Sequence, residues 1–197
     1  SLIPFNSKKL YQRLNGKSDK TRINLLYLLS RFDLSIEQAK ALYIEEEREK
    51  QGISRTDKEY LENPYLIFED LRFTLIPTAL STIDLGLYIK NAPENLLPNR
   101  LVFNDPFENH RIRALTIQQL EWAAQTGHTL LPRKEIIKQI RNLSIRPLCP
   151  INSDYFELAE ECFDDCVALV EMKNDEVAYQ LSRLATAREI INQKITD

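Results

Sequence analysis

Glycine, histidine, cysteine and tryptophan are scarce in this sequence. Its 197 residues include four Gly, two His, three Cys and one Trp. So few glycines leave little room for the Gly-rich loops that cradle phosphates. Three cysteines cannot all pair, and a chain of this length buries enough surface to fold without cross-links, so we expect reduced thiols and a cytoplasmic protein. No apolar run approaches the roughly 20 residues of a membrane span, and we expect no membrane partner.

The charges are arranged in alternating blocks. Net charge is +6 in residues 1–32, −6 in 33–70, −1 in 71–110, +5 in 111–150 and −7 in 151–197, which gives −3 in total. Blocks of this size are typical of solvated faces, or of subdomains that dock on one another. The net charge of −3 argues against a protein that binds nucleic acid over its whole surface. The two basic blocks are the surfaces that could face phosphate.

Leucine-rich and capping patterns predict two helices at the start of the chain. The first covers residues 21–31 and is rich in Leu. Ser35 with Gln38 forms a capping box, because the hydroxyl accepts the amide three residues on and the Gln side chain reaches back. The helix that follows is predicted to end near Gly52. Its apolar stripe consists of Ile36, Ala39, Leu42 and Tyr43.

Three further short helices are expected before the middle of the chain. Thr56 with Glu59 repeats the capping box. Asn63-Pro64 is an N-cap followed by a proline at the first helical position, which predicts a helix that ends near Leu71. Prolines then interrupt the pattern, with one helix expected over residues 79–86.

The second half is more regular. Asp105-Pro106 is expected to start a helix that ends at Gly127, a good residue for the position after a helix. An extended piece over residues 129–131 follows. Pro132 then occupies the first position of another helix. Its apolar side carries Ile136, Ile137 and Ile140.

Near the end of the chain we expect a helix, a hairpin and a last helix. Asn152 or Ser153 caps a helix that runs to about Asp165. Two runs with strand propensity, 167–172 and 176–181, flank a polar tripeptide and predict a β-hairpin. A final helix from about residue 183 to 194 closes the chain. The order helix, short strand, helix, helix, hairpin is that of a winged-helix module, although other small α+β domains share it.

These elements predict a mainly α-helical protein of two modules. A helix-hairpin-helix-like bundle occupies residues 1–90, a linker covers 91–105, and a winged-helix-like module with a small β-hairpin covers 106–197. Because the chain begins with Ser1 and its last helix runs to the end, we expect it to be a piece of a longer protein.

Few residues suggest catalysis or a cofactor. Gly16-Lys17-Ser18 is similar to the end of a P-loop, but the motif needs a glycine where Tyr11 stands. Four residues, named at the end of this paragraph, could together bind zinc, but their spacing lacks the paired ligands of structural zinc sites. The cysteines are better explained as small side chains buried in the apolar core. We therefore expect no catalytic residue, no metal and no cofactor in these residues. The four are His128, Cys149, Cys162 and Cys166.

The nucleic-acid hypothesis depends on where the basic residues lie. In a winged helix the third helix enters the DNA groove. Here residues 152–165 contain six carboxylates and no Lys or Arg, which would repel phosphate. Contacts with DNA are instead expected from cations on other elements. The candidates are Lys17, Lys20, Arg22, Arg31, Arg111, Arg113, Arg133, Lys134, Lys138 and Arg141.

Three stretches together resemble a known family. They are Asn63-Pro64-Tyr65-Leu66-Ile67-Phe68-Glu69, Ser81-Thr82-Ile83-Asp84 and Gly127-His128-Thr129-Leu130-Leu131-Pro132. In this order they resemble the region upstream of the motor in RecD-like ATP-dependent DNA helicases, relatives of the exodeoxyribonuclease V alpha subunit. The resemblance spans about residues 23–195. The chain departs from the family at the helix-hairpin-helix turns, which usually contain glycine but here read Phe32-Asp33-Leu34 and Thr74-Leu75-Ile76-Pro77.

The resemblance implies a non-catalytic accessory region of a DNA-repair helicase. It would position the motor of the same chain and guide single-stranded DNA, while ATP and Mg²⁺ would bind in the motor beyond Asp197. An alternative interpretation is a protein–protein scaffold or regulatory adaptor with no nucleic-acid role, which the acidic blocks favour. Salt-dependent binding of single-stranded DNA distinguishes the two.

Overall fold

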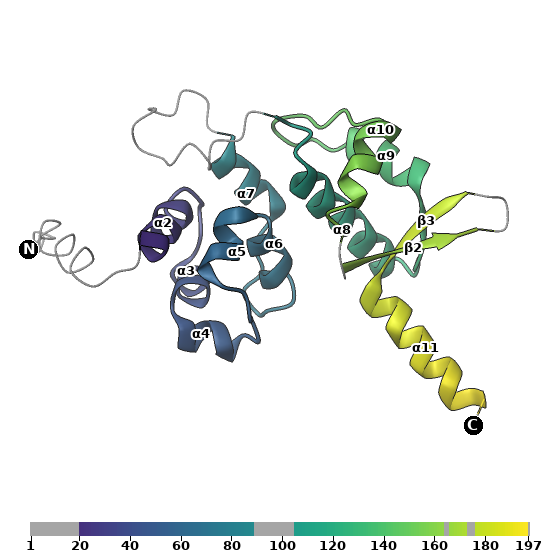
Figure 1. The fold of residues 1–197 in the computed structure, drawn as a ribbon, viewed down its shortest axis with the longest axis horizontal. Helices are drawn as coiled ribbons and strands as arrows, with labels where there is room; N and C mark the ends of the chain where they lie inside the picture. The colour runs from purple at the N-terminus through teal and green to yellow at the C-terminus, as the bar shows by residue number, and fades with distance from the viewer. Residues whose placement is uncertain (1–19, 89–104, 164–165, 173–175, 197) are drawn as a thin grey trace, which may run out of the picture. The chain divides into compact units, whose positions relative to one another are not determined.

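The computed structural model describes residues 20–88, 105–163, 166–172 and 176–196. The described residues form ten helices and one three-stranded antiparallel sheet near the C-terminus (Figure 1). The chain divides into two compact units, Ser1–Val102 and Phe103–Asp197. The predicted mainly helical class with a small sheet is confirmed, whereas most of the predicted linker lies outside the described residues.

Unit 1 is built from short helices, most of them at the predicted places. Both capping boxes are confirmed: the Ser35 hydroxyl accepts the Gln38 amide, and the Thr56 hydroxyl accepts the Glu59 amide. The predicted N-cap at Asn63 is wrong: α6 begins at Leu66 with Tyr65 as its N-cap, and Asn63 Oδ1 instead accepts the amide of Tyr65 at 3.1 Å in the turn before the helix. The helices are α2 (Lys20–Leu29), α3 (Ile36–Tyr43), α4 (Glu45–Lys50), α5 (Asp57–Glu62), α6 (Leu66–Leu71) and α7 (Leu80–Leu87).

One predicted helix is in fact two. The helix expected to run from Ile36 to Gly52 breaks at Ile44, whose backbone is extended. The two carbonyls that would continue the helix are used elsewhere. The guanidinium of Arg48 donates to the carbonyl of Leu42, and the guanidinium of Arg22 donates to the carbonyl of Tyr43. Because these carbonyls accept side-chain donors, the helix stops and α4 begins in a new direction.

A carboxylate of α5 connects three helices of unit 1. Asp57 accepts from Arg22 of α2 at 3.0 Å and from Arg48 of α4 at 2.7 Å. A second buried polar link joins α6 to α7, where the Tyr65 hydroxyl donates to Asp84 Oδ1 at 2.8 Å. Tyr65 and Asp84 are both almost fully buried. These links orient the helices around an apolar core that includes Leu25, Leu28, Leu42, Tyr60, Ile67, Leu71 and Ile83.

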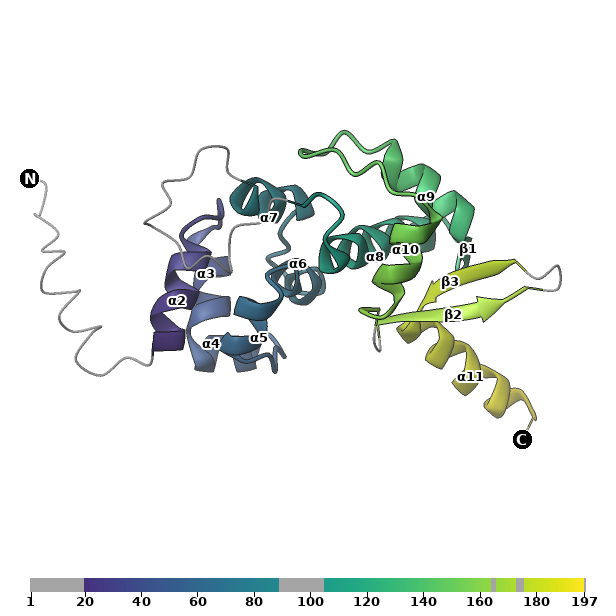
Figure 2. The same ribbon diagram turned by 45° about the horizontal axis from the view of Figure 1, so that its top comes forward.

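Unit 2 is a helix-and-sheet unit. It contains α8 (Asn109–Gln125), β1 (Leu131–Pro132), α9 (Arg133–Arg141), α10 (Ser153–Glu160), β2 (Val167–Glu171), β3 (Val177–Leu181) and α11 (Ser182–Thr196). Gly127 adopts a positive φ of 87° after α8, as its predicted position requires. Helix α10 ends at Glu160, about five residues earlier than predicted. The final helix leads away from the sheet (Figures 1 and 2).

The sheet has the order β1-β3-β2. The predicted hairpin is confirmed, with Leu169 opposite Tyr179 in antiparallel register. The extended piece after Gly127 forms the third strand, because Leu131 pairs with Tyr179 on the other side of β3. The core beneath contains the three isoleucines predicted for α9 and a cluster of rings in edge-to-face contact, Phe156, Phe163 and Tyr179.

Candidate nucleic-acid interface

The basic candidates of unit 1 are mostly engaged in internal contacts. Lys17 lies outside the described residues, as does the Gly16-Lys17-Ser18 stretch, and Lys20 is exposed at the start of α2. Burial opposes the charge of Arg22, yet its hydrogen bond to Asp57 raises the pKa of the guanidinium. Arg31 is half-buried and donates to the carbonyl of Leu87 at 3.3 Å. Burial lowers the pKa of Arg31. Lys20 is therefore the most accessible described candidate in this unit.

The turn between α2 and α3 uses its own amides. The amides of Arg31 and Phe32 donate to carbonyls of α2 at 3.1 and 3.2 Å, and the amide of Leu34 donates to the carbonyl of Phe32 at 2.9 Å. Asp33 is exposed at the tip. A phosphate at this turn would meet a carboxylate and lose three of the amide donors that grip it in a glycine-containing hairpin.

Two of the arginine candidates in unit 2 are buried. Arg111 is fully buried in α8 and donates to the carbonyls of Pro106 at 2.9 Å and Pro147 at 2.5 Å. Arg113, with an exposed fraction of 2%, donates to the carbonyl of Cys162. Guanidinium groups held in this way are structural donors, because a buried charge needs such partners. We therefore remove both residues from the set that could contact DNA.

Arg133 connects α9 to α10 and the sheet. Its Nε donates to the Tyr179 hydroxyl at 2.9 Å, and its Nη2 lies 2.8 Å from Glu160 Oε1; Glu157 is a second ion-pair partner. Burial opposes the guanidinium charge, but the Tyr179 hydroxyl and the two carboxylates raise the pKa of Arg133. Its charge is thus matched within the unit and is poorly placed to attract phosphate.

The remaining three candidates form a row on α9. Lys134, Lys138 and Arg141 are spaced by four and three residues, so they lie along one face of the helix. All three are exposed. Lys134 lies 3.2 Å from Glu176, and Lys138 lies 3.4 Å from Glu135. Exposed pairs of this kind are weak and exchange readily with other anions. We call these three residues the α9 row.

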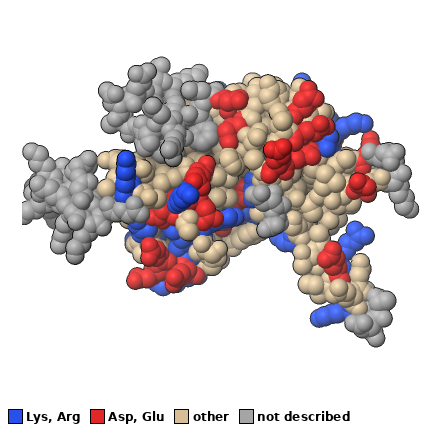
Figure 3. Space-filling model, in the orientation of Figure 1, with Lys and Arg blue, Asp and Glu red and all other residues tan. Residues whose placement is uncertain are grey.

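Helix α10 has the opposite charge. Asp154, Glu157, Glu160 and the C-cap Glu161 lie on it without any Lys or Arg. Figure 3 shows acidic side chains gathered where Figure 1 draws α10. The sequence predicted DNA contacts from both helices that precede α10, and of those candidates only the residues of the α9 row, Lys134, Lys138 and Arg141, are exposed.

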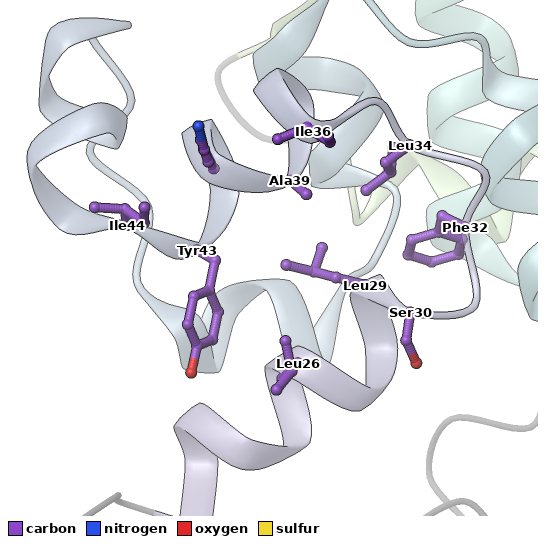
Figure 4. A pocket seen from close by; sticks show the side chains of 10 residues that line it. Leu26, Leu29, Ser30, Phe32, Leu34, Ile36, Ala39, Tyr43 and Ile44 are labelled. Carbon is purple, nitrogen blue, oxygen red and sulfur yellow. The ribbon is translucent and has the colours of Figure 1, made fainter. Parts of the chain in front are cut away.

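An apolar groove lies between α2 and α3 of unit 1, and the sequence did not predict it (Figure 4). Its volume is about 410 Å³. Ile36, Ala39 and Tyr43, three residues of the predicted apolar stripe, line this groove, and Ile36 is 69% exposed. The other lining residues are Leu26, Leu29, Ser30, Phe32, Leu34, Lys40 and Ile44. The groove offers apolar contact area and no pair of acid and base groups.

The cysteines and histidines of the described residues do not converge. Cys149 is buried, with its Sγ 3.4 Å from the carbonyl of Pro106. His110 Nδ1 lies 2.6 Å from Glu108, while His128 is exposed after α8. In the described parts of the chain, no three His, Cys, Asp or Glu side chains are grouped so that they could hold a metal ion. These residues are better explained by packing and local hydrogen bonds.

None of the described helices is both long enough and apolar enough to cross a membrane.

Comparison with other proteins adds no family assignment. No protein-family model, curated protein sequence or solved structure matches the chain.

Proposed function

We propose that this chain is a non-catalytic accessory region of a RecD-like ATP-dependent DNA helicase in the cytoplasm. Unit 1 is its helix-hairpin-helix-like bundle and unit 2 its winged-helix-like module. It positions the motor of the same protein and contacts single-stranded DNA through the α9 row. ATP and Mg²⁺ belong to the motor and not to these residues.

The positions of the three motif stretches support the family part of this proposal. The Asn-Pro-Tyr and Thr-Ile-Asp stretches meet in the buried hydrogen bond between Tyr65 and Asp84. The third stretch follows α8 with Gly127 at a positive φ, supplies β1 and provides the N-cap of α9, Pro132. Residues at such junctions determine how helices join, so their order in a sequence is informative about the fold. The helix-strand-helix-helix-strand-strand order of unit 2 is that of a winged helix.

The observation that carries the DNA part is the exposure of the α9 row. Three cations along one helix face can neutralise successive phosphates without any base contact, which gives affinity that depends on salt and not on sequence. Three phosphates on a single strand correspond to a slope of about −2 when log affinity is plotted against log salt concentration. This predicts a roughly 15-fold loss of affinity between about 50 and 200 mM NaCl.

The test is fluorescence anisotropy with a labelled oligo(dT) of about 20 nucleotides, from about 25 to 200 mM NaCl. The variant carries Lys134→Gln, Lys138→Gln and Arg141→Gln. We expect the salt slope to fall close to zero. The matched control replaces three exposed cations of α11 with Gln, and we expect it to leave the slope unchanged. These are Arg183, Arg188 and Lys194.

Two results would contradict the DNA proposal. One is an unchanged slope in the α9 variant, and the other is an equal loss in the α11 control. Absence of binding at low salt by a folded chain would favour the second candidate function, a protein–protein scaffold or regulatory adaptor. The apolar groove supports that alternative, because an isoleucine 69% exposed beside other apolar side chains is typical of a protein-binding surface.

A further inference from the structure

The outward face of α10 combines exposed apolar side chains with acidic ones. Tyr155 is 41% exposed and Leu158 is 59% exposed. They are three residues apart and lie next to each other on the helix surface. Beside them runs a second row of Asp154, Glu157 and Glu161, all exposed. The opposite side of the helix is buried in the core of unit 2 through Phe156 and Ala159. We call these five exposed residues the α10 face.

Three contacts, in addition to the buried side of the helix, hold this face in place. The Tyr155 ring stacks on Phe107, with centroids 4.3 Å apart and planes 11° from parallel. The Tyr155 amide donates to Asn152 Oδ1 at 3.0 Å, which caps the helix. Asn109 Nδ2 donates to the Leu158 carbonyl at 3.5 Å. A partner would thus meet a preorganised surface, because the side chains of a fixed helix lose little freedom on binding.

The electrostatics of the α10 face select the partner. Arg133 matches the charge of Glu157 and Glu160. Asp154 and Glu161 have no ion-pair partner among the described residues. The face therefore repels phosphate and attracts cations, and its two large apolar side chains offer area that small ions cannot use. Basic side chains interleaved with apolar ones match both features.

We propose that the α10 face docks a basic, amphipathic polypeptide segment of another protein. Apolar side chains of the segment pack against Tyr155 and Leu158, and its Lys or Arg residues lie near Asp154 and Glu161. The helix that reads DNA in a winged helix thereby becomes a protein-binding element. This docking does not depend on the α9 row, so each proposal is tested by its own variants.

The probe is a labelled synthetic peptide of leucine and lysine about 14 residues long, which makes about four helical turns with Leu on one face. Its affinity for the full chain is measured by anisotropy at about 50 and 300 mM NaCl. Two control peptides replace every Lys by Glu or every Leu by Ser. We expect saturable binding of the leucine–lysine peptide and at least tenfold weaker binding of both controls.

Substitutions on the protein locate the site. Leu158→Ser is expected to raise Kd about tenfold, since it removes most of the apolar contact. Its matched control is Ile190→Ser on α11, which is 49% exposed and should leave Kd unchanged. Glu161→Lys should raise Kd several-fold at low salt and little at high salt, whereas Glu189→Lys on α11 should not. Circular dichroism confirms that each variant is folded.

Three outcomes would overturn the proposal. The first is a folded chain that shows no saturable binding of the leucine–lysine peptide. The second is an equal loss of affinity in Leu158→Ser and Ile190→Ser, which would mean that the peptide binds elsewhere. The third is an unchanged Kd at low salt in Glu161→Lys, which would mean that the acidic side chains of this face do not contribute to binding.

Discussion

Replacing Gly86 by alanine is expected to destabilise unit 1, although the position is helical and alanine is the better helix former. A Cβ built at Gly86 would lie 2.3 and 2.7 Å from Cδ1 and Cε1 of Phe32, and 2.8 Å from the carbonyl oxygen of Arg31. All three distances are well inside van der Waals contact. The absence of a side chain at Gly86 is thus what lets α7 approach the turn after α2.

The magnitude follows from two opposing effects. Alanine gains about 1 kcal/mol over glycine in a helix interior. Overpacking a tight interior costs about 1–3 kcal/mol. The upper end applies here, because Phe32 is buried and the Arg31 oxygen belongs to the backbone and cannot rotate away. The net loss is about 1–2 kcal/mol, which corresponds to an opening equilibrium of unit 1 raised about five- to thirtyfold.

Amide hydrogen exchange, followed by mass spectrometry, measures this opening equilibrium of unit 1 locally, in peptides that cover residues 26–34 and 80–87. Adding Phe32→Leu to Gly86→Ala should recover part of the loss, since it removes ring atoms but leaves the Arg31 oxygen. Gly52→Ala is the control: its φ of 72° makes alanine cost about 1 kcal/mol, yet nothing lies within 4 Å, so Phe32→Leu should not rescue it. A Gly86→Ala variant as protected as the parent chain would refute the close approach.

Three further predictions concern polar links in unit 1. Tyr65→Phe removes the donor to the buried carboxylate of Asp84 and should cost about 2 kcal/mol in urea unfolding. Hydrogen bonds from the Thr56 amide and hydroxyl lower the pKa of Glu59. The ionised carboxylate should therefore stabilise the fold above about pH 5, and this effect should vanish as the pH falls toward about 3. The difference in unfolding free energy between the parent chain and Glu59→Gln should shrink over that range. Burial raises the pKa of Asp70, so the carboxyl binds its proton more tightly in the folded chain. The free energy of unfolding should therefore rise as the pH falls toward about 4. Urea titrations at several pH values should show that Asp70→Asn removes this rise in unfolding free energy.

Local signals in the sequence predicted most element positions correctly. Capping boxes depend on residues three positions apart, so the sequence alone contains both partners, and those at Ser35 and Thr56 are present. The hairpin likewise follows from two adjacent runs around a polar tripeptide. Gly127 was recognised because a positive φ after a helix strongly favours glycine. In each case the determining interactions span only a few residues.

The break at Ile44 could not be predicted in this way. No glycine or proline marks it, and the residues around it favour a continuous helix. The break coincides with side-chain donors on the carbonyls of Leu42 and Tyr43, one of which comes from Arg22 in another helix. Ile36 and Tyr43 of the helix before the break line the groove. A helical stripe read from sequence identifies an apolar face but does not say whether another element covers it.

The placement of the cations shows why counting basic residues overestimates a phosphate-binding surface. A guanidinium has several donors in a fixed fork, so one arginine can satisfy carbonyls or carboxylates from segments far apart in the chain. Arg111 is an example, because it joins the start of α8 to the carbonyl of Pro147. The ammonium of lysine is strongly hydrated and tends to remain in water, as in Lys134, whose side chain is 86% exposed. Five of the six arginine candidates make internal contacts, and all three described lysine candidates are exposed. Where many backbone carbonyls at helix ends are free to accept arginine donors, lysines are therefore the better guide to a surface that phosphate can reach. This is why the test of DNA binding is placed on the α9 row.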